Sequence, residues 1–150
     1  MPPIIADWQL VVTTLIQEAL LEPLDGKVGV AEVIRDRTAT RYQSDGTISG
    51  TILKPKQFSG WNGLSLNRAE SVRLDLTHPQ VIECMKAYEI AFKLKSNRAK
   101  GANLYHASWM KVFPSWTKAP NVVEVARLGQ HIFYKESKPS GSTARRRNQK

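Results

Sequence analysis

The sequence has little of several features that define common protein classes. Its single cysteine, Cys84, excludes an internal disulfide. No apolar run reaches the ~18 residues of a membrane span, and no basic segment precedes an apolar block near the N-terminus, so we expect neither a span nor an export signal. The three histidines are widely spaced and no second thiol is present, so we expect no metal site and no cofactor. The absence of a glycine-rich phosphate loop and of a Gly-x-Ser-x-Gly elbow argues against nucleotide enzymes and serine hydrolases.

Acidic residues are fewer than basic ones. The 150 residues include 22 Lys and Arg against 13 Asp and Glu, which gives a formal net charge of +9. Such a chain is attracted to polyanions, and nucleic acid, an anionic cell envelope and acidic lipid headgroups all qualify. Part of the excess lies in residues 135–150, where Lys and Arg are mixed with Pro, Ser, Gly and Thr. This composition predicts a flexible basic tail.

Residues 1–134 have the length and apolar content of one domain. Apolar residues at helical spacing predict three helices, over residues 7–21, 24–41 and 79–95. In the second of these, we expect Glu32, Arg35 and Asp36 to lie largely opposite the apolar face. Residues 42–63 have the glycine content of a loop, and two short strands are expected at 102–106 and 131–134. The sequence therefore predicts an α+β fold, mainly helical with a short antiparallel β element.

One carboxylate, Glu18, stands where the first helix should be apolar. It follows Leu15 by three residues and Val11 by seven, so its side chain projects along the edge of the apolar stripe. Partial desolvation at such a position raises the pKa of a carboxyl group, which suits a general acid near neutral pH. Helical position alone favours the alternative, a glutamate near a helix end that reaches solvent.

Four segments in a fixed order carry more information than any one of them. They are EALLEPLDG at 18–26 running into VAEVIRDR at 30–37, KQFSGW at 56–61, GANLYHA at 101–107 with PSW at 114–116, and LGQHIFY at 128–134. In this order they resemble the SleB-like cell-wall hydrolase family, which includes spore-cortex-lytic enzymes and phage or bacterial peptidoglycan hydrolases. The resemblance covers about residues 15 to 134, most of the chain.

The resemblance implies a small lysozyme-like domain that cleaves peptidoglycan between N-acetylmuramic acid and N-acetylglucosamine. The family's catalytic acid/base glutamate falls on Glu18. Leu21 departs from the family pattern, which commonly has glycine there, and Asp36 stands where asparagine is common. If the C6 hydroxyl of the muramic acid attacks, the enzyme is a lytic transglycosylase, which family precedent favours; if water attacks, it is a muramidase. An N-acetylmuramoyl-L-alanine amidase is a further alternative, although the usual zinc ligands are not evident.

Further residues are candidates for substrate binding. Gln57 and Ser59 carry amide and hydroxyl groups suited to sugar hydroxyls or an N-acetyl group, and loop polarity is the alternative explanation. His131 lies on a short predicted strand, where a structural hydrogen bond to a backbone carbonyl is favoured over a role in the site. Three aromatic residues can stack on sugar faces, although at least one of them is expected in the core: Trp61, Tyr105 and Trp116.

Functions of other classes stay open at this stage. A nucleic-acid-binding protein is supported by the charge and the tail, but the basic residues are dispersed and no reading motif is present, so no specific nucleic acid is expected. A wall-binding module would need Glu18 to be inert. We expect a monomer that binds glycan strands and, through its tail, the anionic envelope. Its expected setting is that of an endolysin, made in the bacterial host cytoplasm and acting on the wall after release.

Overall fold

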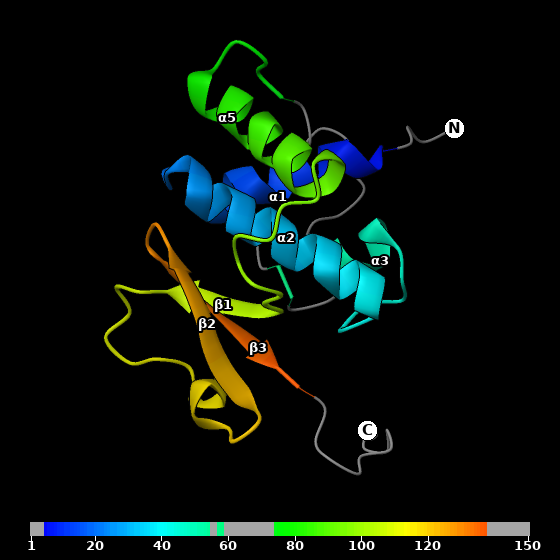
Figure 1. The fold of residues 1–150 in the computed structure, drawn as a ribbon. Helices are drawn as coiled ribbons and strands as arrows, with labels where there is room; N and C mark the ends of the chain where they lie inside the picture. Colours follow the sequence, from blue (N-terminus) through cyan, green and yellow to red (C-terminus); the bar gives the residue numbers. More distant parts are fainter. Residues whose placement is uncertain (1–4, 55–56, 59–73, 138–150) are drawn as a thin grey trace.

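The α-helices and the strands occupy separate parts of the molecule (Figure 1). The computed structural model describes residues 5–54, 57–58 and 74–137. Its α-helices are α1 (Asp7–Ala19), α2 (Leu24–Thr40), α3 (Ile48–Ile52) and α5 (Pro79–Tyr88), and its strands are β1 (Leu104–Ala107), β2 (Val122–Leu128) and β3 (His131–Glu136). This arrangement confirms the predicted α+β class. Among the described residues, no helix has the length and apolarity needed to cross a membrane.

Helix α1 contributes its predicted apolar face to the core. Its buried side chains recur at the spacing that places them on one side of a helix; they include Leu10, Val11, Val12, Leu15 and Ala19. The helix ends at Ala19, so Glu18 occupies its last turn. Leu21, which departs from the family pattern, lies in the turn that follows and is 87% exposed. Its larger side chain therefore extends into solvent.

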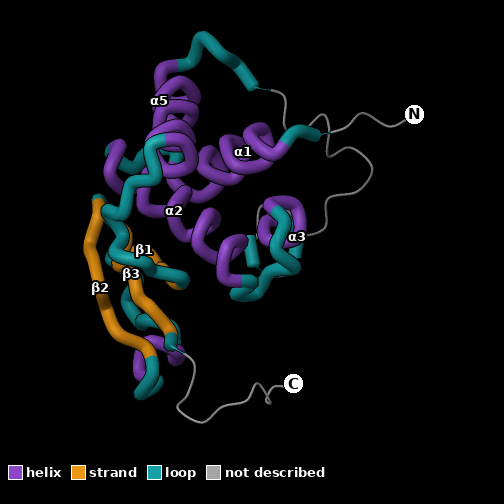
Figure 2. The backbone as a smooth tube through the Cα atoms, turned by 45° about the vertical axis from the view of Figure 1, so that its right-hand side comes forward, coloured by secondary structure: helices purple, strands orange, loops and turns teal. Residues whose placement is uncertain are grey.

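Helix α2 lies between α1 and α5 on one side and the sheet on the other (Figures 1 and 2), and most of its residues are buried. A Cβ atom on Gly29 would lie 2.5 Å from the ring of Phe133, so glycine permits the helix to approach the sheet closely. The prediction that Glu32 lies opposite the core is wrong, because this residue is 1% exposed. Its carboxylate accepts the backbone N–H groups of Arg98 and Ala99 at 2.9 and 2.7 Å, which replace the water lost on burial.

Helix α5 begins where the sequence predicts. His78 is the N-cap, its Nδ1 accepts the Gln80 backbone N–H at 3.1 Å, and Pro79 follows as the first helical residue. Cys84 is fully buried on the inner face, as its apolar surroundings in the sequence suggest. Burial raises the pKa of the Cys84 thiol to about 11. The thiol therefore stays protonated near neutral pH and behaves as a small apolar group.

The third predicted helix changes its winding before it ends. After Tyr88 it continues as a π-helical turn (Glu89–Lys93) and does not reach residue 95. Arg35 on α2 donates hydrogen bonds to the carbonyl oxygens of Ala91 and Ser96, at 2.7 and 2.6 Å. Because this guanidinium supplies partners for carbonyls at the end of the helix, the chain can leave the regular α-helical ladder there.

Strands β1, β3 and β2 form an antiparallel sheet in that order. Tyr105 on β1 pairs with Phe133 on β3, and the β2–β3 hairpin turns at Gly129, whose φ is +58°. Two of the strands lie where the sequence predicts them to within about two residues, whereas β2 was not predicted. Strand β3 continues to Glu136, so the first two residues of the segment expected to be a tail belong to the sheet.

The sheet has two different faces. Tyr105 and Phe133 face the helices and pack with the main core. Alternation along the strands turns His106 and Tyr134 to the other face, where they pack with a short 3-10 helix, η3 (Ser115–Lys118), through Trp116. Neighbouring residues of one strand, such as Tyr105 and His106, therefore pack on opposite faces of the sheet.

The segment predicted as a loop between the second and third helices contains one short helix, α3. Thr47 caps it, since its Oγ1 accepts the Gly50 backbone N–H at 2.9 Å. Thr51 and Ile52, the last two residues of α3, are buried. A five-residue helix is too short to show a period in the sequence, and its tertiary contacts stabilise it.

Candidate active site

Glu18 and Tyr105 meet where the end of α1 approaches the sheet. The Tyr105 hydroxyl donates a hydrogen bond of 2.5 Å to Glu18 Oε1, and both side chains are partly buried. Burial raises the pKa of the Tyr105 phenol well above its usual value, and the nearby Glu18 charge and hydrogen bond raise it further. The phenol is therefore a permanent donor that fixes one carboxylate oxygen of Glu18.

A buried guanidinium lies next to this pair. Arg37 on α2 is 6% exposed. Burial lowers the pKa of its guanidinium, and the charges of Tyr105 and Glu18 act in the opposite direction. The Arg37 guanidinium therefore lies close enough to the Tyr105–Glu18 pair to feel the charge of the Glu18 carboxylate.

Arg37 is held by groups from several parts of the chain. Its Nε donates to the Asn103 carbonyl oxygen at 2.8 Å, and its Nη1 donates to Gln57 Oε1 at 3.2 Å. The guanidinium lies over the rings of Tyr42 and Phe58, with Cζ 5.6 and 5.4 Å from the ring centroids. These contacts fix its position relative to β1, which begins directly after Asn103.

A second carboxylate, Glu22, follows Glu18 by four residues but has different partners. Its Oε1 accepts the Gln130 backbone N–H at 2.6 Å and contacts His131 Nδ1 at 3.1 Å. The side chains of Glu22 and His131 are only 11% and 9% exposed. Glu22 is therefore bound to the β2–β3 hairpin, and it joins the turn after α1 to the sheet.

Two glycines make room for Glu22. A Cβ atom on Gly26 would lie 2.8 Å from Glu22 Oε1, and one on Gly129 would lie 2.5 Å from it and 2.9 Å from Pro23 Cδ. Gly129 also has a positive φ that other residues adopt at a cost. The turn and the hairpin can approach each other only because both positions lack a side chain.

The two acidic groups are linked through aromatic contacts. The rings of Tyr105 and His131 meet edge to face, with centroids 5.1 Å apart, and Tyr105 also contacts Phe133 at 5.7 Å. Glu18, Tyr105, His131 and Glu22 thus form a continuous row of contacts. The row contains two partly buried carboxylates, of which Glu18 binds a phenol hydroxyl and Glu22 binds the β2–β3 hairpin.

The structure brings some of the predicted site residues together and not others. Tyr105 contacts Glu18 directly, Gln57 reaches this region through Arg37, and His131 lies beside Tyr105 with a carboxylate partner in place of the expected backbone carbonyl. Trp116 lies elsewhere. Its ring packs against Tyr134 and His106 on the opposite face of the sheet, at 5.2 and 5.8 Å. Ser59 and Trp61 lie outside the described residues.

Two residues of the site had no role in the sequence-based prediction. Arg37 closes one of the family-like segments, but an arginine on a helix is usually solvent-exposed and gave no local signal. Glu22 lies one helical turn after Glu18, and its position in the sequence alone indicates no partner. The glycine at position 129, next to His131, was the available hint, because a glycine in a hairpin often marks a close approach of backbone or side chains.

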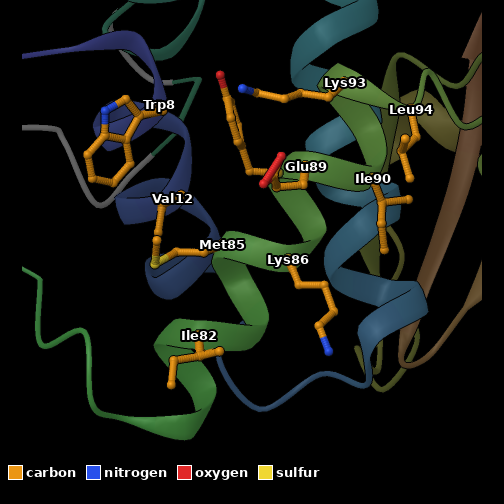
Figure 3. Close-up of a pocket in the computed structure, with 10 residues that line it drawn as sticks. Trp8, Val12, Ile82, Met85, Lys86, Glu89, Ile90, Lys93 and Leu94 are labelled. Atoms are coloured by element: carbon orange, nitrogen blue, oxygen red, sulfur yellow. The ribbon is translucent and has the colours of Figure 1, made fainter.

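An apolar groove lies away from this site (Figure 3). It runs between α1 and α5, has a volume of about 630 Å³ and is lined by residues such as Trp8, Met85 and Leu94. It contains none of the residues predicted for the site. Its apolar lining does not suit the polar surface of a glycan, so we assign the candidate active site to the Glu18 region.

Known proteins resemble this chain in sequence and in fold. The model of the cell wall hydrolase family matches residues 21–134, a range that begins three residues after Glu18. The catalytic domain of the germination-specific lytic transglycosylase SleB from Bacillus anthracis has a TM-score of 0.63 and 23% identity, covering 90% of this chain and 100% of its own. The catalytic domain of the Bacillus cereus SleB protein has a TM-score of 0.62 and 23% identity, covering 86% and 89%.

These similarities fix the fold and the family. The two structural matches confirm the predicted lysozyme-like domain. No curated protein matches the chain in sequence. Since the family model spans most of the chain, the chain belongs to the cell wall hydrolase family, whose activity is the degradation of peptidoglycan.

Proposed function

We propose that the protein is a lytic transglycosylase that cleaves the bond between N-acetylmuramic acid and N-acetylglucosamine, with Glu18 as its acid/base. The observation that carries this proposal is the hydrogen bond from Tyr105 to a partly exposed carboxylate at the end of α1. The family supplies the class of substrate. The SleB catalytic domain from Bacillus anthracis, which has the same fold, is itself a lytic transglycosylase, and this supports the reaction type.

The proposed reaction uses the two protonation states of Glu18. The protonated carboxyl gives its proton to the glycosidic oxygen while the bond from that oxygen to C1 of the muramic acid breaks. The glucosamine leaves with a new hydroxyl group. The C6 hydroxyl oxygen of the muramic acid then bonds to C1, and its proton returns to the Glu18 carboxylate. The product is a 1,6-anhydro sugar, no water is consumed and the enzyme returns to its starting state.

Neighbouring groups support the two states of Glu18. Tyr105 holds Oε1, so the other oxygen is the one that carries the proton toward the substrate. Once the proton has left, the Tyr105 donor and the nearby Arg37 guanidinium stabilise the negative charge. The amide of Gln57 accepts from Arg37 through its oxygen, so its NH₂ group is the donor that it offers to a sugar.

The contacts of Glu22 favour transglycosylation over hydrolysis. A retaining hydrolase needs a second carboxylate as nucleophile, and an inverting one needs a second carboxylate to activate water. Glu22 is the next carboxylate along the chain, but its Oε1 accepts from two groups of the β2–β3 hairpin and its side chain is 11% exposed. The C6 hydroxyl is tethered beside C1, so it has a large effective-concentration advantage over water.

We further propose that the basic segment at residues 138–150 attracts the enzyme to the anionic envelope, because its Lys and Arg residues lie beyond the catalytic domain. The setting proposed for this activity is that of an endolysin. In that setting a protein made in the host cytoplasm reaches the wall after release, and it acts on the wall as a monomer.

The test is to digest purified peptidoglycan with the wild-type protein and with Glu18→Gln, and to identify the new ends by mass spectrometry. Glutamine is nearly isosteric and keeps an acceptor for Tyr105 but cannot cycle a proton. We expect the variant to lose about 10²- to 10⁴-fold in rate with an unchanged thermal midpoint. Asp7→Asn, which removes an exposed carboxylate at the other end of α1, is the matched control and should keep full activity.

The products distinguish the alternatives. The proposal predicts 1,6-anhydromuramic ends and no new reducing ends. Reducing muramic ends as the main product would mean hydrolysis by a muramidase, and free stem peptides would mean an amidase. Full turnover by Glu18→Gln with a normal midpoint would remove Glu18 from the mechanism.

A further inference from the structure

An exposed apolar loop lies between β1 and η3. In the 108–113 loop, Trp109 is 72% exposed, Val112 is 80% exposed and Phe113 is 39% exposed. Single exposed apolar residues are normal on protein surfaces, whereas several that are adjacent indicate a surface for interaction. Three large apolar residues within five positions of one loop are such a group.

The loop is anchored at both of its ends. The Ser108 backbone N–H donates to the Gln130 carbonyl oxygen at 2.8 Å, which ties the start of the loop to the β2–β3 hairpin. At the other end, the ring of Phe113 packs on His106 with centroids 4.3 Å apart. The loop is therefore held in place with Trp109 and Val112 exposed, so binding through it costs little conformational entropy.

The surroundings of the loop are positively charged. Lys111 lies within the loop and Lys118 ends η3, and both are exposed. Residues 100–128 contain four Lys and Arg and a single carboxylate, Glu124. That carboxylate is engaged by Arg127 through two contacts of 2.7 and 3.0 Å. The surface around the exposed apolar residues of the loop therefore carries a net positive charge.

Beyond Ser108, the loop leads away from Glu18. It leaves β1 and runs away from the helices toward η3 (Figure 1). Phe113 contacts His106, which lies on the outer face of the sheet, whereas the neighbouring Tyr105 lies on the inner face with Glu18. A surface that binds through the 108–113 loop would therefore leave the Glu18 region open to a glycan strand.

We propose that the 108–113 loop docks the protein on an anionic lipid bilayer. Trp109 and Val112 enter the interfacial zone, where tryptophan is favoured because its ring is apolar and its N–H is polar. Lys111 and Lys118 contact the anionic headgroups, with their apolar stems along the interface. Charge decides among the possible occupants. A second copy of this chain is disfavoured, because its loop would bring a second positive surface against the first. A glycan strand is disfavoured, because the Val112 side chain cannot form a hydrogen bond with it.

The test is co-sedimentation of the full chain with phosphatidylglycerol-containing vesicles and with pure phosphatidylcholine vesicles. Measurements at raised salt screen the exposed charges, including those of the basic tail, and leave the apolar contribution. The variant that replaces both Trp109 and Val112 by serine should bind anionic vesicles at least about tenfold more weakly. Leu94→Ser is the matched control, because Leu94 is 74% exposed but lies on the helical side, and it should bind like the wild type.

A charge variant separates the two parts of the proposal. Lys111→Ser should weaken binding to anionic vesicles by about fivefold at low salt and should leave binding to neutral vesicles unchanged. Thermal midpoints of all variants should match the wild type, since the replaced side chains are exposed. The assay needs no catalysis, so it can fail while the proposed activity stands, and the reverse also holds.

Four results would overturn the docking proposal. The first is no binding of the wild type to anionic vesicles at low salt. The second is equal binding of the wild type and the double serine variant at raised salt, which would mean that Trp109 and Val112 contribute nothing to membrane binding. The third is loss of binding to purified peptidoglycan, and not to vesicles, in the double variant. The fourth is self-association of the wild type that the double variant abolishes.

Discussion

The approach of the β2–β3 hairpin to the turn after α1 depends on the missing side chain of Gly129. Alanine at this position meets two penalties. Its φ of +58° costs a non-glycine residue about 1 to 2 kcal/mol, and its Cβ would lie 2.5 Å from Glu22 Oε1 and 2.9 Å from Pro23 Cδ. Overpacking of this kind costs about 1 to 3 kcal/mol. We therefore expect Gly129→Ala to lower the free energy of unfolding by about 2 to 5 kcal/mol.

Gly101→Ala is the matched control for this prediction. Gly101 also has a positive φ, of +82°, but its added Cβ would meet only the flexible end of Lys135, at 3.6 Å. Gly101→Ala should therefore lower the free energy of unfolding only by the cost of the positive φ, about 1 to 2 kcal/mol. Thermal unfolding measures both, at roughly 2 to 4 °C per kcal/mol for a chain of this size. Equal losses in the two variants would mean that the contact with Glu22 adds nothing and that our account of the hairpin is incorrect.

Two further substitutions test the site and its support. Tyr105→Phe removes the donor to Glu18 and should lower kcat/KM by roughly 10- to 100-fold with little change in thermal midpoint, whereas Tyr134→Phe on the outer sheet face should keep full activity. Lys27→Met removes a fully buried ammonium that binds α5 and the turn after α1, and it should cost about 3 kcal/mol in thermal unfolding. Replacing the partly exposed Arg98 by Met should cost less than about 1 kcal/mol.

The main helices can be predicted because their signals are local. Apolar residues in α1 recur at the helical spacing, and Pro79 after His78 marks the start of α5. Strand β2 has a weaker signal, since its seven residues mix Val with Glu and Arg. The glycine that follows it, between two runs rich in β-branched and aromatic residues, indicates a hairpin only when both runs are considered together.

The burial of α2 cannot be predicted from its own sequence. Glu32 and Arg35 are typical of a solvated helix face, but the π-helical turn and the segment after it supply partners: Arg35 binds Ala91 and Ser96, and Glu32 binds Arg98 and Ala99. The partners come from residues 91–99, more than fifty positions away. A periodicity argument contains no such distant information, so it assigns buried charges to solvent.

The site residues also differ in whether their role can be predicted from local sequence. Glu18 is conspicuous because it interrupts an apolar stripe, and Tyr105 stands in a family-like segment. Trp116 is near Tyr105 in sequence, yet alternation along β1 and the path of the 108–113 loop carry it to the opposite face of the sheet. Arg37 reaches the site from within a buried helix. Which aromatic residue meets the acid thus depends on strand parity and packing, neither of which sequence spacing determines.

The clearest test of the single-carboxylate mechanism compares Glu22→Gln with Glu18→Gln. A glutamine at position 22 keeps an oxygen that accepts from Gln130 and His131, so the hairpin contact survives without the negative charge. If Glu22 serves only to position the turn, its variant should lose less than about tenfold in rate, far less than the 10²- to 10⁴-fold expected for Glu18. Both should show 1,6-anhydro ends in any residual product. A loss as deep as that of Glu18→Gln, at an unchanged thermal midpoint, would make Glu22 a second catalytic carboxylate and would favour hydrolysis over transglycosylation.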